Sequence, residues 1–153
     1  MKENLMVPCI ILCGGRGKRM GNLTNEIPKP MIEVRKKPII WHIIIGLYKK
    51  GFRDFIFPLG YKGHKIEEYL VTLNLDGINL IFKQTGTDQN IGNRLYQVRK
   101  YLNNDRFIMV NGDCISDFDG ISLYKKNIEL NSLVTLVTCK IISPYGLFSY
   151  NRN

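Results

Sequence analysis

The sequence predicts an α/β fold, a Rossmann-like three-layer α/β/α arrangement in which helices cover both faces of a mostly parallel sheet. Short runs rich in β-branched residues alternate with helix-length segments, which is the pattern of right-handed βαβ crossovers. The length of 153 residues fits one domain covering residues 1–153. A hydrophobic content of 44% is enough to build a core and excludes a disordered chain.

The N-terminal part predicts two strand–helix units. The first strand is a buried apolar run that stops at Gly14 and Gly15. Pro38 before an apolar segment, lysines at its end and Gly51 just beyond it are typical of a helix. The elements expected here are the strand Val7–Leu12, the helix Ile39–Lys50, the strand Asp54–Leu59 and the helix His64–Leu75.

The remainder of the chain continues the alternation. The expected elements are the strand Ile78–Lys83, the helix Asn93–Leu102, the strand Phe107–Val110, a helix around Leu123–Leu130 and the strand Leu133–Cys139. Ligands of such sheets bind at the carboxyl ends of the strands. The loops 13–20, 84–94 and 111–119 are therefore the places to look for a site.

The charge balance favours a phosphate-bearing partner. Lys and Arg number 22 against 13 Asp and Glu, a formal net charge of +9. A nucleic-acid-binding domain is a less favoured alternative, because the lysines are scattered and lack interleaved aromatic residues. No apolar run approaches the roughly 20 residues of a membrane span, and the N-terminus does not resemble a signal peptide. We expect no membrane partner and a cytoplasmic location.

The cysteines do not predict a metal site. No two of the four have C-x-x-C spacing, and the chain has only two histidines. We interpret all four as small buried hydrophobic residues of a reducing compartment. They are Cys9, Cys13, Cys114 and Cys139.

A basic glycine loop follows the first strand. In Gly14-Gly15-Arg16-Gly17-Lys18-Arg19, backbone amides could cradle phosphate oxygens while the side chains add positive charge. A P-loop is excluded because Arg19 stands where Ser or Thr is required, and a dinucleotide fingerprint because Met20 replaces its third glycine. The alternative is an ordinary strand-to-helix turn with solvated cations. The preceding strand and the three cations favour phosphate binding.

Two further residues fit the same chemistry. Lys29 lies between Pro28 and Pro30, which restrict where its ammonium group can go. Asp113 follows a buried strand, where a carboxylate can bind a divalent cation. Taken singly, Lys29 could be an ordinary surface lysine, and Asp113 could form an Asx turn.

Together these segments resemble the signature of the sugar-phosphate nucleotidyltransferases. The paired motifs are residues 12–20 and 28–31, and the similarity extends over nearly the whole chain through 37–43, 60–63, 85–86, 92–95 and 112–113. The branch that the chain resembles is that of the glucose-1-phosphate cytidylyltransferases. The resemblance implies the nucleotide-diphospho-sugar transferase type of fold, here shortened at its C-terminal, sugar-phosphate-binding part.

The resemblance also implies roles for particular residues. Arg19 and Lys29 would neutralise phosphate charge during catalysis, and Asp113 would bind Mg²⁺. The nucleotide-binding positions would be Leu12, Cys13, Gly14, Gly15, Arg16, Gly17, Lys18, Gln89 and Arg94. Ile91 and Asn93 depart from the cytidylyltransferase pattern, which has a threonine and a glycine there.

The implied reaction transfers CMP from CTP to glucose 1-phosphate and releases pyrophosphate, giving a nucleotide sugar for surface polysaccharide synthesis. Its partners would be the nucleoside triphosphate and the sugar 1-phosphate, with a homo-oligomer as a candidate assembly. Because both reactants are anionic, catalysis would depend on positioning and on Arg, Lys and Mg²⁺ offsetting charge. A binding-only or inactive nucleotidyltransferase-like domain remains the main alternative.

Overall fold

The predicted parallel sheet is confirmed. The computed structural model describes residues 7–17, 26–102 and 106–140. Four parallel strands pair in the order β5-β4-β1-β6. They are β1 (Cys9–Leu12), β4 (Asp54–Leu59), β5 (Asn79–Gln84) and β6 (Ile108–Asn111). A short 3₁₀ helix η2 (Lys29–Met31) and a separate antiparallel hairpin of β2 (Glu33–Val34) and β3 (Lys37–Pro38) lie between β1 and β4 in sequence.

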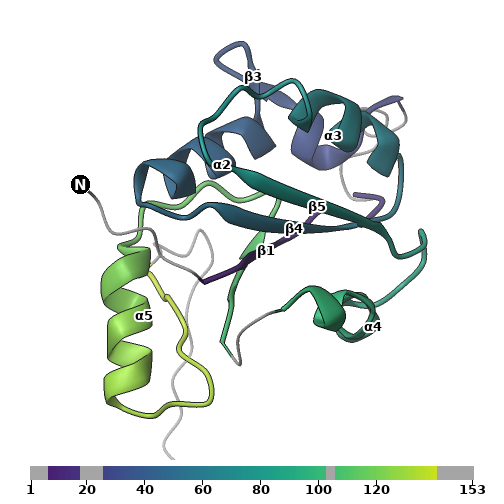
Figure 1. The fold of residues 1–153 in the computed structure, drawn as a ribbon. Helices are drawn as coiled ribbons and strands as arrows, with labels where there is room; N and C mark the ends of the chain where they lie inside the picture. Colours follow the sequence, from purple (N-terminus) through teal and green to yellow (C-terminus); the bar gives the residue numbers. More distant parts are fainter. Residues whose placement is uncertain (1–6, 18–25, 103–105, 141–153) are drawn as a thin grey trace, which may run out of the picture.

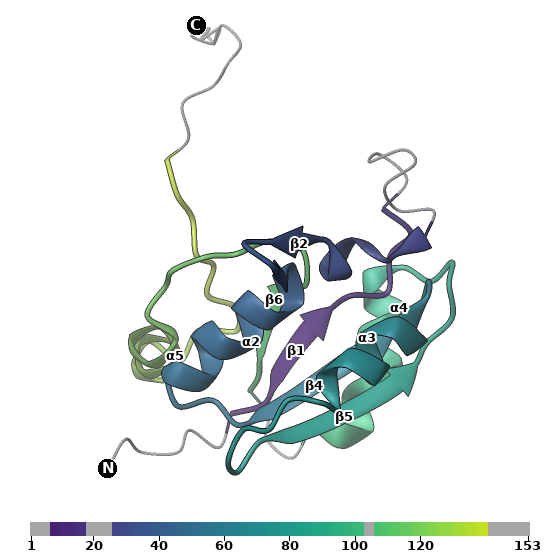
Figure 2. The ribbon, with the colours of Figure 1, turned by 90° about the horizontal axis from the view of Figure 1, so that it is seen from above.

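Helices lie on both faces of this sheet, as predicted. Helices α2 (Ile39–Lys49) and α3 (Gly63–Leu70) lie on one face, and α4 (Ile91–Val98) lies on the other, followed by the 3₁₀ helix η3 (Arg99–Tyr101) (Figures 1 and 2). Helix α5 (Gly120–Glu129) stands at one side of the sheet, away from α3 and α4 (Figure 1). No helix in the described ranges has the length and apolarity needed to cross a membrane.

The alternation of side chains along β1 builds two cores. Cys9 and Ile11 point to the face covered by α2 and α3, where Phe55 and Phe57 of β4 join the larger cluster. Ile10 points to the opposite face and packs with residues of α4 in a smaller cluster. The five named side chains of β1 and β4 are fully buried. At about 1.5–3 kcal/mol for each large apolar side chain, their burial stabilises the sheet that positions the loops above it.

The connections change sides of the sheet at β1. The chain leaves β1 for β4 through α2 on one face and reaches β6 from β5 through α4 on the other. β1 and β6 therefore form the topological switch point, with Leu12 and Asn111 as register partners at their carboxyl ends. A crevice outside the strand ends is expected at this place.

Several helix boundaries differ from the predicted ones for local reasons. Helix α3 ends at Leu70, five residues early, where the Thr72 hydroxyl donates to the Tyr69 carbonyl oxygen at 2.7 Å and competes with continuation of the helix. Helix α4 begins early because the Asn90 side chain accepts a hydrogen bond from the Asn93 amide and caps it. Asp119 caps α5 in the same way.

The predicted strand Leu133–Cys139 is wrong. The segment forms no strand, and the described strands do not pair with it. Its apolar side chains are exposed, including Leu133 and Leu136. Apolar composition favours a strand only when a neighbouring strand supplies backbone hydrogen bonds. The interpretation of the cysteines needs the same correction, because Cys9 and Cys13 are buried whereas Cys114 and Cys139 are exposed.

The β2–β3 hairpin turns through two residues in the left-handed region, which the sequence does not favour. Arg35 has φ 50° and Lys36 has φ 63°, although two-residue turns of this kind normally contain Asn and Gly. Such a conformation costs roughly 1–2 kcal/mol at a residue with a side chain. The hairpin is nevertheless held on α2 by a 2.8 Å hydrogen bond between His42 Nε2 and the Val34 carbonyl oxygen.

The double substitution Arg35→Asn/Lys36→Gly is therefore expected to stabilise the protein. We expect the free energy of unfolding in urea to rise by about 1 kcal/mol, since both new residues tolerate positive φ. The control Arg35→Gln/Lys36→Gln removes the same charges without relieving the backbone and should show no such gain. Equal stability of the two variants would contradict the explanation.

Candidate functional site

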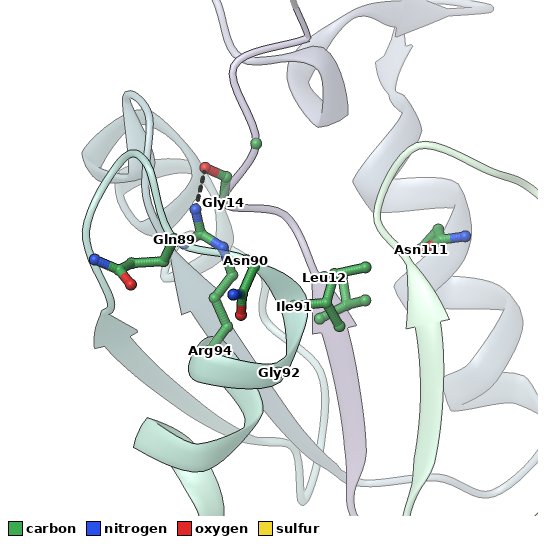
Figure 3. A pocket seen from close by; sticks show the side chains of 9 residues that line it. Leu12, Gly14, Gln89, Asn90, Ile91, Gly92, Arg94 and Asn111 are labelled. Carbon is green, nitrogen blue, oxygen red and sulfur yellow. Dashed lines mark hydrogen bonds between the residues drawn. The ribbon is translucent and has the colours of Figure 1, made fainter.

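A pocket of about 570 Å³ lies at the switch point, in the size range of ligand sites. Its walls come from the end of β1, the loop after it, the end of β6 and the start of α4 (Figure 3). The lining residues are Leu12, Gly14, Gly15, Gln89, Asn90, Ile91, Gly92, Arg94 and Asn111. The sequence-predicted positions Leu12, Gly14, Gly15, Gln89 and Arg94 are thus brought together in one place.

The glycine loop packs closely against its neighbours. The Gly14 carbonyl oxygen accepts hydrogen bonds from the Tyr61 amide at 3.1 Å and from Arg94 Nη2 at 3.0 Å. A side chain at Gly14 would overlap the Arg94 guanidinium, and its Cβ would lie 2.9 Å from the Pro58 carbonyl oxygen. A Cβ on Gly15, in contrast, would meet nothing within 4 Å. The first glycine is required for packing, and the second leaves open space where a ligand can approach.

Arg94 ties the loops around the pocket to one another. Its side chain starts from α4 and is buried, with the residue only 4% exposed. The guanidinium donates to the carbonyl oxygens of Leu59, Gly14 and Thr87 at 3.0–3.3 Å. It also donates to the Thr85 hydroxyl at 2.5 Å. One side chain thereby holds the end of β4, the glycine loop and the loop after β5. Figure 3 shows its hydrogen bond to Gly14.

Burial changes the ionisation of two groups beside the pocket. It lowers the pKa of Arg94, although an arginine in protein remains charged at neutral pH. It also raises the pKa of the Cys13 thiol to about 12. Cys13 points into the larger core and is 2% exposed, so its side chain does not line the pocket. Any ligand contact by Cys13 would have to involve its backbone.

Two ion pairs lie near the glycine loop. Arg16 forms a forked pair with Asp88, with Nε 3.1 Å from Oδ1 and Nη2 3.3 Å from Oδ2. Lys29 Nζ lies 2.8 Å from Asp113 Oδ2. The predicted phosphate-binding lysine and the predicted metal-binding aspartate therefore contact each other directly. Gly17 has φ 64°, which a glycine tolerates, and the predicted Lys18 and Arg19 lie outside the described residues.

The sequence reasoning did not single out some of the lining residues. Asn90 caps α4 and could have been found from the Asn that precedes the helical pattern. Asn111 ends β6 opposite Leu12, but only the strand register brings the two together. The Asn93 side chain donates to Gln89 Oε1, so this departure from the cytidylyltransferase pattern contacts a predicted nucleotide-binding residue.

This arrangement suits a phosphorylated ligand with a divalent cation. The open glycine loop and the cations Arg16 and Lys29 can contact phosphate oxygens. Asp113 is partly exposed and can offer a carboxylate oxygen, while the described residues contain no group of three or more His, Cys, Asp or Glu side chains suited to a metal. Mg²⁺ fits such a site, because it commonly binds one or two carboxylates together with substrate phosphates.

Comparison with known proteins identifies the family of the chain. The profile of the family described as Nucleotidyl transferase matches residues 8–149. A probable glucose-1-phosphate cytidylyltransferase of Bacillus subtilis (strain 168) is 31% identical, with 90% of this chain and 62% of the relative covered. A D-glycero-alpha-D-manno-heptose 1-phosphate guanylyltransferase of Campylobacter jejuni is 33% identical, with 72% of this chain and 49% of the relative covered.

The likeness extends to solved structures. HddC from Yersinia pseudotuberculosis, crystallised in complex with GMP-PN, superposes with a TM-score of 0.68 at 28% identity. The match covers 84% of this chain and 55% of HddC, so the chain spans about half to three-fifths of the length of these relatives. With the family profile matched over nearly all of its length, the chain belongs to the nucleotidyl transferase family.

Proposed function

We propose that the pocket at the ends of β1 and β6 binds a nucleoside triphosphate with Mg²⁺, for transfer of its nucleotidyl group to a sugar 1-phosphate. The observation that supports this most directly is the open glycine loop that lines the pocket. Asp113, two residues beyond the pocket-lining Asn111, and its ion-pair partner Lys29 add a partly exposed carboxylate and a cation. The chain would supply the nucleotide-binding part of the reaction. Its expected location is the cytoplasm.

Each group would have a simple electrostatic task. Arg16 and Lys29 would bind phosphate oxygens, and Arg19 in the same loop would offset charge on the departing pyrophosphate. Asp113 would hold Mg²⁺, which supplies charge neutralisation and orientation of the phosphates when bound. Arg94 would act indirectly, because both terminal nitrogens of its guanidinium donate to protein oxygens around the pocket. No protein nucleophile is required for this chemistry.

CTP and glucose 1-phosphate are our first candidates for the two substrates. The B. subtilis relative carries a cytidylyltransferase name, and the sequence motifs resemble that branch. The C. jejuni relative carries a guanylyltransferase name, so the choice of base is a separate question from the choice of reaction. Ile91 lines the pocket and the Asn93 side chain contacts Gln89. These contacts support the proposal that both departures from the cytidylyltransferase pattern affect the choice of base.

The binding half of the proposal predicts saturable binding of Mg²⁺·CTP in calorimetric titrations, compared with UTP, GTP and ATP. Arg19→Ala and Asp113→Ala should each weaken Mg²⁺-dependent binding by at least about tenfold, the effect of a lost charge-assisted contact. Arg99→Ala is a matched control, because Arg99 is exposed and stacks on Tyr96 away from the pocket. Absence of binding to every triphosphate would contradict the proposal.

Turnover is tested separately by pyrophosphate release with glucose 1-phosphate and other sugar 1-phosphates. Release that depends on the acceptor would support the full reaction. Binding of Mg²⁺·CTP without release from any acceptor would instead favour the binding-only alternative.

A further inference from the structure

The ion pair between Lys29 and Asp113 is built from two firmly placed backbone segments. Lys29 begins η2, in which the Met31 amide donates to the Pro28 carbonyl oxygen at 2.8 Å. Asp113 follows Gly112, whose amide donates to the Leu12 carbonyl oxygen at 2.9 Å and ties this turn to β1. The 2.8 Å contact therefore joins two turns that lie far apart in the sequence and that each have local backbone hydrogen bonds.

In the proposed function, Lys29 and Asp113 bind two ligands of opposite charge. A triphosphate requires the Lys29 ammonium, and Mg²⁺ requires the Asp113 carboxylate. Each group neutralises the other in this contact, and both side chains remain about one-third exposed. A ligand can reach either group, but it must compete with the partner residue for it.

Resting on the proposed function, we infer that this pair couples the two binding events. A phosphate that draws Lys29 away leaves Asp113 available to the metal, and a metal on Asp113 leaves Lys29 available to the phosphate. Each ligand thus removes a cost that the other would otherwise meet, and the coupling is reciprocal by thermodynamic linkage. In this role the contact between Lys29 and Asp113 weakens the binding of either ligand alone and is given up when both ligands bind.

Binding measurements with one ligand at a time reveal this coupling. For CTP titrated in EDTA, Asp113→Asn should raise the affinity about fivefold, the upper end for a partly exposed ion pair. For Mn²⁺ titrated without nucleotide and followed by electron paramagnetic resonance, Lys29→Met should raise the affinity by a similar factor. With both ligands present, either substitution should lower affinity.

A double-mutant cycle distinguishes the effect of the Lys29–Asp113 contact from simple repulsion between Asp113 and the phosphates of CTP. If Asp113 only repels phosphate, Asp113→Asn will increase metal-free CTP affinity equally in the wild-type and Lys29→Met backgrounds. If Asp113 also holds Lys29, the gain will be larger when Lys29 is present. Asp117→Asn is the matched control, since Asp117 pairs with Lys50 at 2.9 Å outside the pocket lining and should leave both affinities unchanged.

The outcomes distinguish this inference from the proposed function. Equal gains in both backgrounds, or no gain from either substitution, would overturn the coupling even if wild-type Mg²⁺·CTP binding is tight. Failure of the wild-type protein to bind Mg²⁺·CTP would overturn the proposed function and, with it, the role of the pair in the site. A larger gain with Lys29 present, together with tighter Mn²⁺ binding by Lys29→Met, would support the coupling.

Discussion

Replacing Arg94 with methionine is expected to lower the free energy of unfolding by roughly 3 kcal/mol, or about 10 °C in Tm. Methionine fills most of the space but donates no hydrogen bonds. The substitution leaves the carbonyl oxygens of Thr87, Gly14 and Leu59 without the guanidinium that joins them. Because the site is 4% exposed, water cannot fully replace those donors. Urea unfolding followed by circular dichroism measures the loss.

Arg94→Lys separates geometry from charge. Lysine keeps the positive charge but presents a single ammonium group, which cannot reach the accepting oxygens on three different segments at once. We expect it to recover less than half of the lost stability. Arg99→Met is the control on the following turn, where the side chain is exposed and donates to the Tyr96 carbonyl oxygen at 2.6 Å; it should cost less than about 0.5 kcal/mol. Equal losses at Arg94 and Arg99 would contradict the tying role.

The parallel sheet could be predicted because each strand is a short apolar run and each crossover carries a helical pattern. The strand Asp54–Leu59 has the predicted bounds. The β2–β3 hairpin could not be predicted, because Arg35 and Lys36 occupy the two turn positions where Asn and Gly normally mark such a turn. The local pattern of the segment 133–139 predicts a strand, but a local pattern cannot show whether a pairing partner is available.

The residues of the candidate site could largely be predicted from the sequence, but the contacts among them could not. Glycines and cations after a strand indicate a phosphate loop, and the switch-point rule places the loop beside the end of β6. The burial of Arg94 and the pairing of Lys29 with Asp113 depend on how distant loops pack. Spacing in the sequence carries no signal for such contacts. The resemblance implies that Arg94 holds the nucleotide, whereas its hydrogen-bond partners in the structure are protein oxygens.

Gly14→Ala is expected to disrupt the packing of Arg94 against the glycine loop. The new methyl group would overlap the Arg94 guanidinium and approach the Pro58 carbonyl oxygen to 2.9 Å, so either the glycine loop or Arg94 must move. We expect a loss of roughly 2–3 kcal/mol in unfolding free energy, typical of overpacking, and loss of detectable Mg²⁺·CTP binding. Gly15→Ala adds the same methyl group where nothing lies within 4 Å and should leave stability within about 0.5 kcal/mol of wild type. Similar stability of the two variants in urea unfolding would show that Gly14 is not held by Arg94, and the loop would then have to owe its shape to other contacts.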